Sequence, residues 1–320
     1  MDIDILVSEV GPRDGLQSIH AVMPLAAKKA WIDAEAGAGV REIEVGSFVS
    51  PKLLPQMADT AEVVAHALTL PGLTVAVLVP NLHGAQAAVK AGAHKMTIAF
   101  SASETHSMKN VRRNHAQMLE EVRQITALLR AQPAGRRPKF EAGMSTAFGC
   151  TYEGDVPADK VVALAEALMQ AGCDEVGLSD SVGFANPAQI KELVTRVRSA
   201  VGAQAFAGLH LHNTRGLGLA NAVAGLEVGV TTFDSSLGGL GGCPFAPGAT
   251  GNIVTEDLVF MLEAMGLRTG IDLPRLMAVR EILRTALPDD ELYGYTPLAG
   301  LPLGFRPISP AVVPSRTSAR

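Results

Sequence analysis

Two histidines separated by one residue, His210 and His212 in the stretch HLHN, have the type and spacing of metal ligands. Alternate side chains of a β-strand point to the same face, so both imidazoles would face one side, about 7 Å apart along the strand. Two imidazoles on one face can bind one metal ion. Such a pair is weak evidence by itself, because many histidines at this spacing bind no metal.

Two oxygen donors could complete this set. Asp14 stands in the stretch VGPRDGLQ, residues 10–17, and Asn252 ends a long glycine-rich segment. A carboxylate, two imidazoles and an amide oxygen make a mixed oxygen and nitrogen ligand set, which suits Mg²⁺ or Mn²⁺. Zinc is less favoured, because no pair of thiolates accompanies the histidines. The four residues can act together only if the fold brings their segments to one place.

The glycine-rich segment LGGLGGCPFAPGATGN, residues 237–252, holds six glycines, two prolines and a single thiol, Cys243. Glycine and proline both weaken helices and central strands, so the segment is predicted to be a surface loop. Glycine also lets a backbone approach a ligand closely. A flexible linker is the alternative, but the segment lies between a predicted strand and a predicted helix.

The elements that must position these residues alternate along the chain. Short runs rich in β-branched or apolar residues predict eight strands, at 5–10, 42–46, 74–79, 95–101, 139–145, 175–179, 207–212 and 231–237. Helical periodicity follows each of them, at 24–38, 57–70, 82–91, 116–130, 159–171, 187–200, 217–228 and 254–265. Glycine near the end of several helices, as in AGC at 171–173, is a typical C-terminal signal.

Strict alternation of strands and helices implies parallel strands with right-handed crossovers. An open doubly wound sheet competes with a closed barrel, but no glycine fingerprint for a dinucleotide follows the first strand. Eight units in about 260 residues fit a (β/α)8 TIM barrel. We therefore predict a barrel over residues 1–270 and a short C-terminal helical extension over 271–320, with a helix at 273–287. We expect the extension to pack on the barrel or on a partner subunit.

In a TIM barrel the active site lies at the C-terminal ends of the strands. Closure would bring strands one, seven and eight together there, and with them the metal-ligand candidates. The same rim would carry Arg13, Glu44, Ser47 and Asp180. Glu9 is expected to be a buried charge paired with an arginine of the rim. The other six histidines have no partner spacing and are expected to be exposed or structural.

Composition limits the class of protein. Of the 320 residues 48% are hydrophobic and 18% are charged, which predicts a sizeable core rather than disorder. A net charge of −5 without a basic stripe argues against nucleic acid as a partner. No apolar run approaches membrane-spanning length, and the start of the chain lacks a signal-peptide pattern. Three cysteines fit a reducing compartment, so we expect a cytoplasmic protein.

Five motifs together resemble one family. VGPRDGLQ, IEVGSFVSPKLLPQMAD, GLSDSVGFANP, LHLHNTRGLGLAN and GGLGGCPFAPGATGNIVTEDLVFML occur in the order and at the spacing of 3-hydroxy-3-methylglutaryl-CoA lyases. The resemblance covers residues 7–265, within a superfamily of barrel metallolyases that share an RDG motif. Condensing relatives share the RDG and His-x-His motifs but lack the cysteine loop. Cys243 therefore favours cleavage over condensation.

The resemblance implies a role for each candidate. The divalent cation, Mg²⁺ or Mn²⁺, would be bound by Asp14, His210, His212 and Asn252. Arg13 would meet the thioester carbonyl, Cys243 would be the catalytic thiol, and Glu44 and Asp180 match further acidic residues near the substrate. Gln17, Ser47 and Ser181 are expected to contact substrate beside Arg13. The family cleaves 3-hydroxy-3-methylglutaryl-CoA to acetyl-CoA and acetoacetate, and a homodimer is the implied assembly.

The chemistry of cleavage requires these residue types. The tertiary hydroxyl must lose its proton while the thioester enolate is stabilised, and a bound cation lowers the pKa of the hydroxyl. A fixed guanidinium stabilises the developing enolate charge. The enolate carbon then needs a proton, which a thiol on a closing loop can deliver while water is excluded.

Several positions depart from the family pattern. They are His20 on the first rim loop, Gly177 where a serine is common, and Asn213 and Arg215 after the second histidine. We expect Gly177 to remove a hydroxyl beside Asp180 and thereby to weaken discrimination between acyl groups. A lyase for another 3-hydroxyacyl-CoA, such as citramalyl-CoA, is therefore an alternative. A metal-binding barrel that serves as an interaction protein without catalysis is a remote one.

Overall fold

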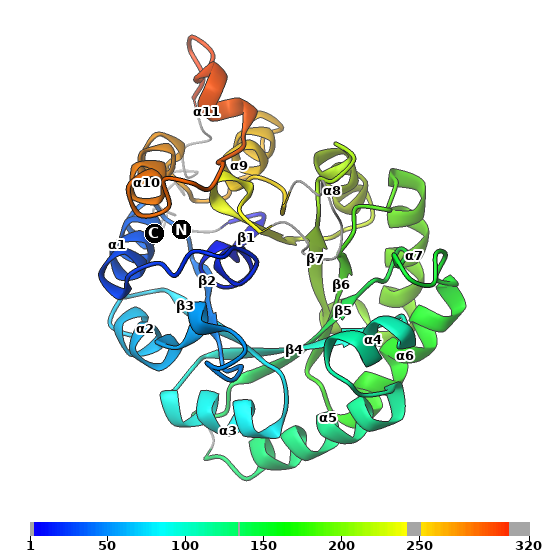
Figure 1. The fold of residues 1–320 in the computed structure, drawn as a ribbon. Helices are drawn as coiled ribbons and strands as arrows, with labels where there is room; N and C mark the ends of the chain where they lie inside the picture. Colours follow the sequence, from blue (N-terminus) through cyan, green and yellow to red (C-terminus); the bar gives the residue numbers. More distant parts are fainter. Residues whose placement is uncertain (1–2, 134, 242–250, 307–320) are drawn as a thin grey trace, which may run out of the picture.

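The structure is a computed structural model that describes residues 3–133, 135–241 and 251–306. Eight parallel strands close into a barrel in chain order, with β1 paired to both β2 and β8 (Figure 1). The strands are β1 (Leu6–Glu9), β2 (Glu42–Ser47), β3 (Thr74–Val79), β4 (Lys95–Ser101), β5 (Lys139–Ser145), β6 (Glu175–Asp180), β7 (Phe206–Leu211) and β8 (Thr232–Ser235). The predicted (β/α)8 TIM barrel is confirmed.

Helices surround the barrel on its outside (Figure 1). They are α1 (Leu25–Gly37), α2 (Thr60–Ala67), α3 (Leu82–Ala91), α4 (Glu104–Asn110), α5 (His115–Arg130), α6 (Ala158–Ala171), α7 (Pro187–Val201), α8 (Gly218–Glu227), α9 (Thr255–Ala264), α10 (Leu273–Ala286) and α11 (Tyr295–Ala299). The sequence did not predict α4 and α11. Within the described ranges, no helix combines the length and the apolar character needed to cross a membrane.

The two faces of each strand differ in character, as β4 shows. Met96, Ile98 and Phe100 are fully buried against the surrounding helices. Lys95, on the opposite face, forms ion pairs with Glu42 of β2 and Glu175 of β6, which lie to either side of it around the barrel. Those pairs are possible only across the barrel interior. Residues 95, 97 and 99 therefore point inward, because alternate side chains share a face.

Glycine ends two of the helices as the sequence predicted. Gly92 after α3 and Gly172 after α6 have φ of 82° and 106°, in the left-handed region that other residues rarely adopt. Their N–H groups return to carbonyls of the last helical turn. Each helix therefore stops one turn before the next strand begins.

The described part of the C-terminal extension packs on the barrel. Leu273, Leu276 and Leu283 of α10 are fully buried, and α10 contacts α1 and α9. Arg280 of α10 donates to Glu256 of α9 at 2.5 Å, with both side chains buried. The short helix α11 contacts α9 and stands away from the barrel (Figure 1). The division of the chain at residue 270 stays a prediction.

Candidate metal centre and active site

A tight turn after β1 places Arg13 and Asp14 on the rim. Gly11–Gly15 forms a single π-helical turn, labelled η1, in which the carbonyl of Val10 accepts from the N–H groups of Arg13 and Asp14 at 3.1 and 2.7 Å. Gly11 is required here, because a Cβ would lie 2.6 Å from a carboxylate oxygen of Glu9. The turn fixes the backbone from which both side chains project.

Asp14, His210 and His212 form the candidate metal site. One donor atom from each lies within 4.8 Å of the others. The Nε2 atoms of the two histidines are 3.1 Å apart, and Asp14 Oδ2 is 4.0 Å from His210 Nε2. Closure of the barrel brings together residues that are almost 200 positions apart in the chain. The set is the one that the sequence singled out.

Asp234 of β8 orients the first histidine. Its Oδ2 lies 3.1 Å from His210 Nδ1, so that Nδ1 can donate and Nε2 keeps its lone pair for a metal. Asp234 is not among the site residues predicted from the sequence. Asp234 is an acidic residue that faces the barrel interior near the end of β8, next to the strand that carries His210. This neighbourhood can be recognised only once the order of the strands in the barrel is known.

Asn252 lies beside Asp14. Its amide nitrogen donates to Asp14 Oδ2 at 2.8 Å and to the carbonyl of Leu240 at 3.2 Å. Two glycines allow this close approach of backbones. A Cβ on Gly251 would lie 2.2 Å from the carbonyl oxygen of Gly239, and one on Gly241 would lie 2.7 Å from Asn252 Nδ2.

The charged side chains of the site stabilise one another's ionised forms. Arg13 donates from Nε to Glu44 and from Nη1 to Asp14, each at 2.5 Å. Burial disfavours the charged guanidinium, but Glu44 and Asp14 outweigh this effect and raise the pKa of Arg13. Burial likewise opposes ionisation of Asp14, yet Arg13 and the two histidines hold its pKa below the ordinary value. Arg13 is therefore a permanent cation and Asp14 a permanent anion.

The two histidines differ. Burial, followed by repulsion from His210, lowers the pKa of His212 to about 4, so His212 is neutral and can act as a ligand. Burial also disfavours charge on His210, but the hydrogen bond to Asp234 and the negative charge of Asp14 raise its pKa. For Glu44, burial is the larger effect and raises the pKa despite the contact with Arg13.

Buried polar atoms without a hydrogen-bond partner indicate whether a metal ion would suit the site. Among the described residues, Asn252 Oδ1 and His212 Nδ1 are buried without a hydrogen-bond partner. Two imidazole Nε2 atoms at 3.1 Å repel each other unless a proton or a cation lies between them. A buried amide oxygen and facing imidazole nitrogens beside a permanent carboxylate are donors that a divalent cation would satisfy. The residues therefore fit a metal ion.

Other predicted site residues lie on the same rim but make other contacts. Asp180 accepts from the backbone N–H groups of Phe184 and Ala185 at 2.8 and 3.1 Å, which closes its own loop. Burial raises its pKa to about 6 despite these bonds. Ser181 Oγ accepts from the N–H of Thr146 at 3.2 Å. The structure does not join these residues to the metal site by hydrogen bonds.

Gln17 and Ser47 face each other, with 3.4 Å between the hydroxyl of Ser47 and Oε1 of Gln17, a long contact. Ser47 is fully buried, whereas Gln17 is partly exposed. Cys243 lies outside the described residues, so its predicted role stays a prediction. Cys150 and Cys173 are buried free thiols, as expected of packing residues.

The expectation that Glu9 pairs with an arginine was wrong. Its carboxylate accepts from the N–H groups of Gly11 and Leu237 and from the hydroxyl of Thr255, at 2.7, 3.0 and 2.7 Å. Strand alternation explains the difference, because Glu9 points outward, away from the rim arginine. It ties the η1 turn to the end of β8 and to the start of α9.

The expectation that a hydroxyl at position 177 would lie beside Asp180 was also wrong, whereas the effect of Gly177 on discrimination between acyl groups stays a prediction. Gly177 and Asp180 are three positions apart and point to opposite faces of β6. A Cβ on Gly177 would point into the barrel and lie 2.7 Å from Oε1 of Glu141. A serine there would meet Glu141 rather than restore a hydroxyl beside Asp180. His20 and Arg215, two other departures, are exposed on rim loops.

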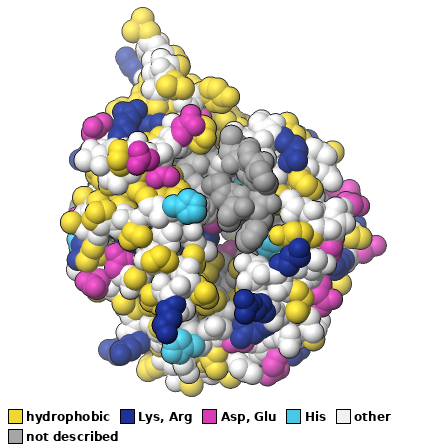
Figure 2. Space-filling view, viewed as in Figure 1, with side chains coloured by type: hydrophobic (Ala, Val, Ile, Leu, Met, Phe, Trp, Pro, Cys, Tyr) yellow, Lys and Arg dark blue, Asp and Glu magenta, His cyan; other side chains and the backbone are white. Residues whose placement is uncertain are grey.

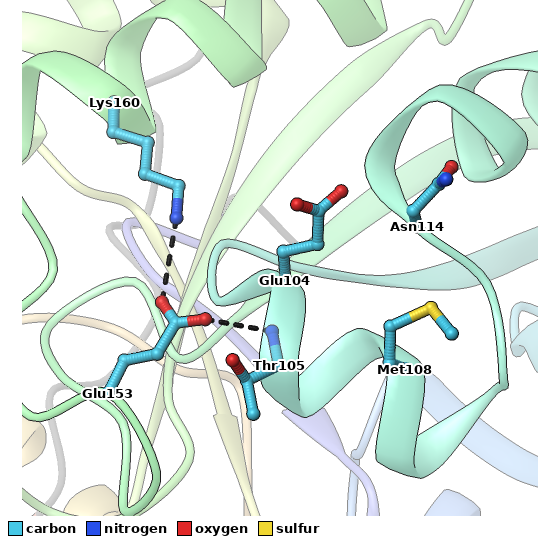
Figure 3. A pocket seen from close by; sticks show the side chains of 6 residues that line it. All are labelled: Glu104, Thr105, Met108, Asn114, Glu153 and Lys160. Atoms are coloured by element: carbon cyan, nitrogen blue, oxygen red, sulfur yellow. Dashed lines mark hydrogen bonds and ion pairs between the residues drawn. The ribbon is translucent and has the colours of Figure 1, made fainter.

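The face of the molecule in Figure 2 is hollowed near its centre, and Lys and Arg side chains border the hollow. Exposed basic residues in the segments that follow the strands include Lys52 and Arg215 on loops and Lys109 in α4. A surface pocket of about 600 Å³ lies elsewhere, between α4 and the start of α6 (Figure 3). Glu153 and Lys160 in its wall pair with each other, and none of its lining residues belongs to the metal site.

Comparisons with known proteins agree with this geometry. Residues 4–283 match the model of the HMGL-like family. The chain is 40% identical to hydroxymethylglutaryl-CoA lyase YngG of Bacillus subtilis, over 90% of this chain and 96% of that protein. It is 42% identical to the mitochondrial hydroxymethylglutaryl-CoA lyase of Gallus gallus, over 88% and 93% of the two chains.

A solved structure shares this architecture throughout. It is an HMG-CoA lyase from Acinetobacter baumannii in complex with coenzyme A and 3-methylmalate. The two chains are 40% identical and superpose with a TM-score of 0.87, over 95% of this chain and 98% of that one.

Proposed function

This chain belongs to the HMGL-like family of carbon–carbon lyases, and we propose that it cleaves 3-hydroxy-3-methylglutaryl-CoA to acetyl-CoA and acetoacetate. The observation that carries the proposal is the cluster of Asp14, His210 and His212 within 4.8 Å, beside the permanent cation Arg13. Relatives that are 40–42% identical along most of their length carry the name of this lyase.

Asp14, His210, His212 and Asn252 would hold one divalent cation, and Mg²⁺ or Mn²⁺ suits their oxygen and nitrogen donors. When bound, the cation lowers the pKa of the substrate hydroxyl and so favours its deprotonation. Asp234 keeps the Nε2 lone pair of His210 available, through the hydrogen bond to Nδ1. Asp14 stays ionised because Arg13 and the histidines hold its pKa down.

Arg13 would stabilise the charge that develops on the thioester oxygen. Glu44 fixes Nε of its guanidinium, and Asp14 fixes Nη1. The remaining N–H groups can donate to the substrate. A donor that is already oriented needs no rearrangement as the enolate forms, which is the principle of an oxyanion hole.

Cleavage breaks the bond between C2 and C3. The hydroxyl loses its proton to a base, C3 becomes the ketone of acetoacetate, and the thioester arm leaves with the electron pair as an enolate. A proton transferred to C2 then completes acetyl-CoA. We assign this transfer to the thiol of Cys243, by the family resemblance of its loop.

The acyl-CoA itself would bind from the outside. The exposed basic residues Lys52, Lys109 and Arg215, which follow β2, β4 and β7, can attract the phosphates of coenzyme A, and such attraction speeds association. The relative from Acinetobacter baumannii was solved with coenzyme A bound.

Product analysis tests the function. Purified protein with Mg²⁺ should release acetyl-CoA and acetoacetate in equal amounts from 3-hydroxy-3-methylglutaryl-CoA. Acetyl-CoA and pyruvate from citramalyl-CoA, with no turnover of the first substrate, would transfer the assignment to the alternative lyase. Release of acetyl-CoA from neither substrate, in protein that binds Mn²⁺, would reject the proposal.

We also propose a homodimer in a reducing compartment such as the cytoplasm. Tyr295, Leu298 and Leu303, on and after α11, are 78%, 84% and 106% exposed, which leaves an apolar arm for a second copy to cover. Light scattering coupled to size exclusion should give twice the monomer mass, and a Leu298→Glu variant should lower it. A wild-type monomer at micromolar concentration would reject the dimer.

A further inference from the structure

Four neighbouring strands, β4 to β7, carry only glycine or alanine at paired positions on their inward faces. Ala99 of β4 pairs with Gly143 of β5, and Gly143 pairs with Gly177 of β6. On β7 both Ala207 and Gly208 lie opposite Gly177, with the Cβ of Ala207 and the carbonyl oxygen of Gly208 each 3.6 Å from the Cβ position of Gly177. We call Ala99, Gly143, Gly177 and Gly208 the glycine band. Gly208 precedes His210 by two residues, so it lies about 7 Å further down β7 than the metal site.

Space remains in front of Gly143. Thr97, Gly143 and Ser145 are partly exposed although they lie inside the barrel, whereas Phe140 and Met144 on the outer face of β5 are fully buried. Among the described residues, a Cβ on Gly143 would come within 4 Å of just two atoms, Cγ2 of Thr97 and the carbonyl oxygen of Ile98. In most TIM barrels, bulky branched side chains fill this interior. Here small or short side chains that are partly exposed stand at these positions instead.

An acidic network forms the floor of this space. Glu141 extends over Gly177 and binds Lys95 at 2.7 Å, and Lys95 also contacts Glu42 and Glu175 at 3.3 and 3.6 Å. Three carboxylates therefore surround one ammonium. Asp234 and Glu44 also point into the interior from β8 and β2. Another carboxylate would be repelled by this network, but an uncharged chain would not be.

We infer that the acyl pocket continues into the barrel and accepts 3-hydroxyacyl-CoA thioesters whose branch at C3 is uncharged and longer than a methyl group. The inference rests on the proposed lyase function. Coenzyme A is too large to enter the barrel and must stay on the rim. With the hydroxyl at the metal site and the thioester oxygen at Arg13, the glycine band leaves room for a branch at C3.

A homologous series of substrates tests this inference. The wild-type enzyme with Mg²⁺ is assayed with 3-hydroxyglutaryl-CoA thioesters that carry methyl, ethyl, propyl or butyl at C3. We expect kcat/KM to vary by less than about tenfold along the series. A fall of about a hundredfold or more from methyl to propyl would overturn the inference and leave the lyase function intact. Failure with every member, methyl included, would reject the lyase function as well.

A larger side chain at position 143 should make the enzyme reject substrates with a longer branch at C3. Gly143 is not among the glycines with positive φ, so other residues can adopt its backbone conformation. Gly143→Val should lower kcat/KM for the propyl substrate at least tenfold more than for the methyl substrate, since one methylene is worth about ten- to a hundredfold in a filled pocket. Equal losses for both substrates would contradict the inference.

Two further variants keep the test decisive. His66→Ala changes a side chain on the outer surface, where His66 pairs with Asp33, and should leave the chain-length profile within about twofold of wild type. If Gly143→Val does not fold, Gly143→Ala adds a single methyl group to the same wall. It should reduce the propyl-to-methyl ratio severalfold, and an unchanged ratio would count against the inference.

Discussion

The outer and inner faces of the same eight strands have opposite properties. On β5 the outward Phe140, Ala142 and Met144 are fully buried and apolar, whereas the inward Glu141, Gly143 and Ser145 are polar or small and partly exposed. The outer face packs against helices and supplies burial of apolar surface. The inner face carries charges, a candidate metal-ligand set and small side chains. Neighbouring residues along a strand therefore have different roles: the outward side chains stabilise the fold, and the inward ones form the candidate site.

The largest effect is expected where the inner face meets the rim. Asp14→Ala or His210→Ala should lower kcat about a thousandfold or more, because each removes a metal ligand and with it the activation of the hydroxyl. Thermal unfolding should shift little. His66→Ala is the matched control, because His66 pairs with Asp33 on the outer surface at 2.7 Å and should leave kcat unchanged. Near-normal kcat in both rim variants would contradict the assignment of the chemistry to the inner face.

Next in size is a substitution on the outer face. Phe140→Ala should lower the free energy of unfolding by about 3–5 kcal/mol, since Phe140 is fully buried and leaves a cavity. The kcat of the protein that stays folded should remain within about threefold of wild type. Denaturant titration and active-site-normalised kinetics measure the two quantities. A large loss of kcat with unchanged stability would mean that the outer face takes part in chemistry.

Asp234→Asn tests the support of His210. The hydrogen bond from Nδ1 would weaken, and metal affinity should fall about ten- to a hundredfold. The change is measured by Mn²⁺ titration, with kcat at saturating metal as a second reading. Asp33→Asn alters the equivalent carboxylate–imidazole pair on the outside and should leave metal affinity unchanged. Equal effects of the two variants would remove the special role of Asp234.

The smallest effect concerns pH. Burial, only partly offset by Lys95, raises the pKa of Glu141 to about 7, above the ordinary carboxyl value. Folded protein therefore binds an extra proton between about pH 5 and 7, and this contribution to stability is lost as pH rises through 7. We expect the loss to be about 2 kcal/mol, and to be smaller in Glu141→Gln. Unfolding free energies at pH 5, 6, 7 and 8 check the sign, and a rise with pH attributable to Glu141 would contradict it.

The sequence predicted the features that depend on the alternation of strands with helices and of outward with inward side chains. The strands were found because their outward residues are apolar and β-branched, and the barrel order then placed Asp14 beside His210. It missed α4, whose sequence ETHSMKN has no apolar stripe. That helix is held instead by its cap Ser103 and by Glu153, which accepts from the N–H of Thr105 at 2.8 Å.

The remaining errors concern contacts between distant segments. β8 was predicted to reach residue 237, but it ends at Ser235, and the N–H of Leu237 binds Glu9 instead. No local pattern around Glu9 records that contact, since 228 positions separate the two residues. The same reason explains why Asp234 was missed and why Gly177 was placed beside the wrong neighbour.

The central claim is that the cluster on the inner face of the rim is a metal-dependent lyase site. Metal-stripped protein should be titrated with Mn²⁺ while bound ion and turnover of 3-hydroxy-3-methylglutaryl-CoA are followed in the same sample. We expect no turnover without metal, and activity that rises in step with Mn²⁺ to a plateau at about one ion per chain. Full turnover in the chelated, metal-free protein would contradict it.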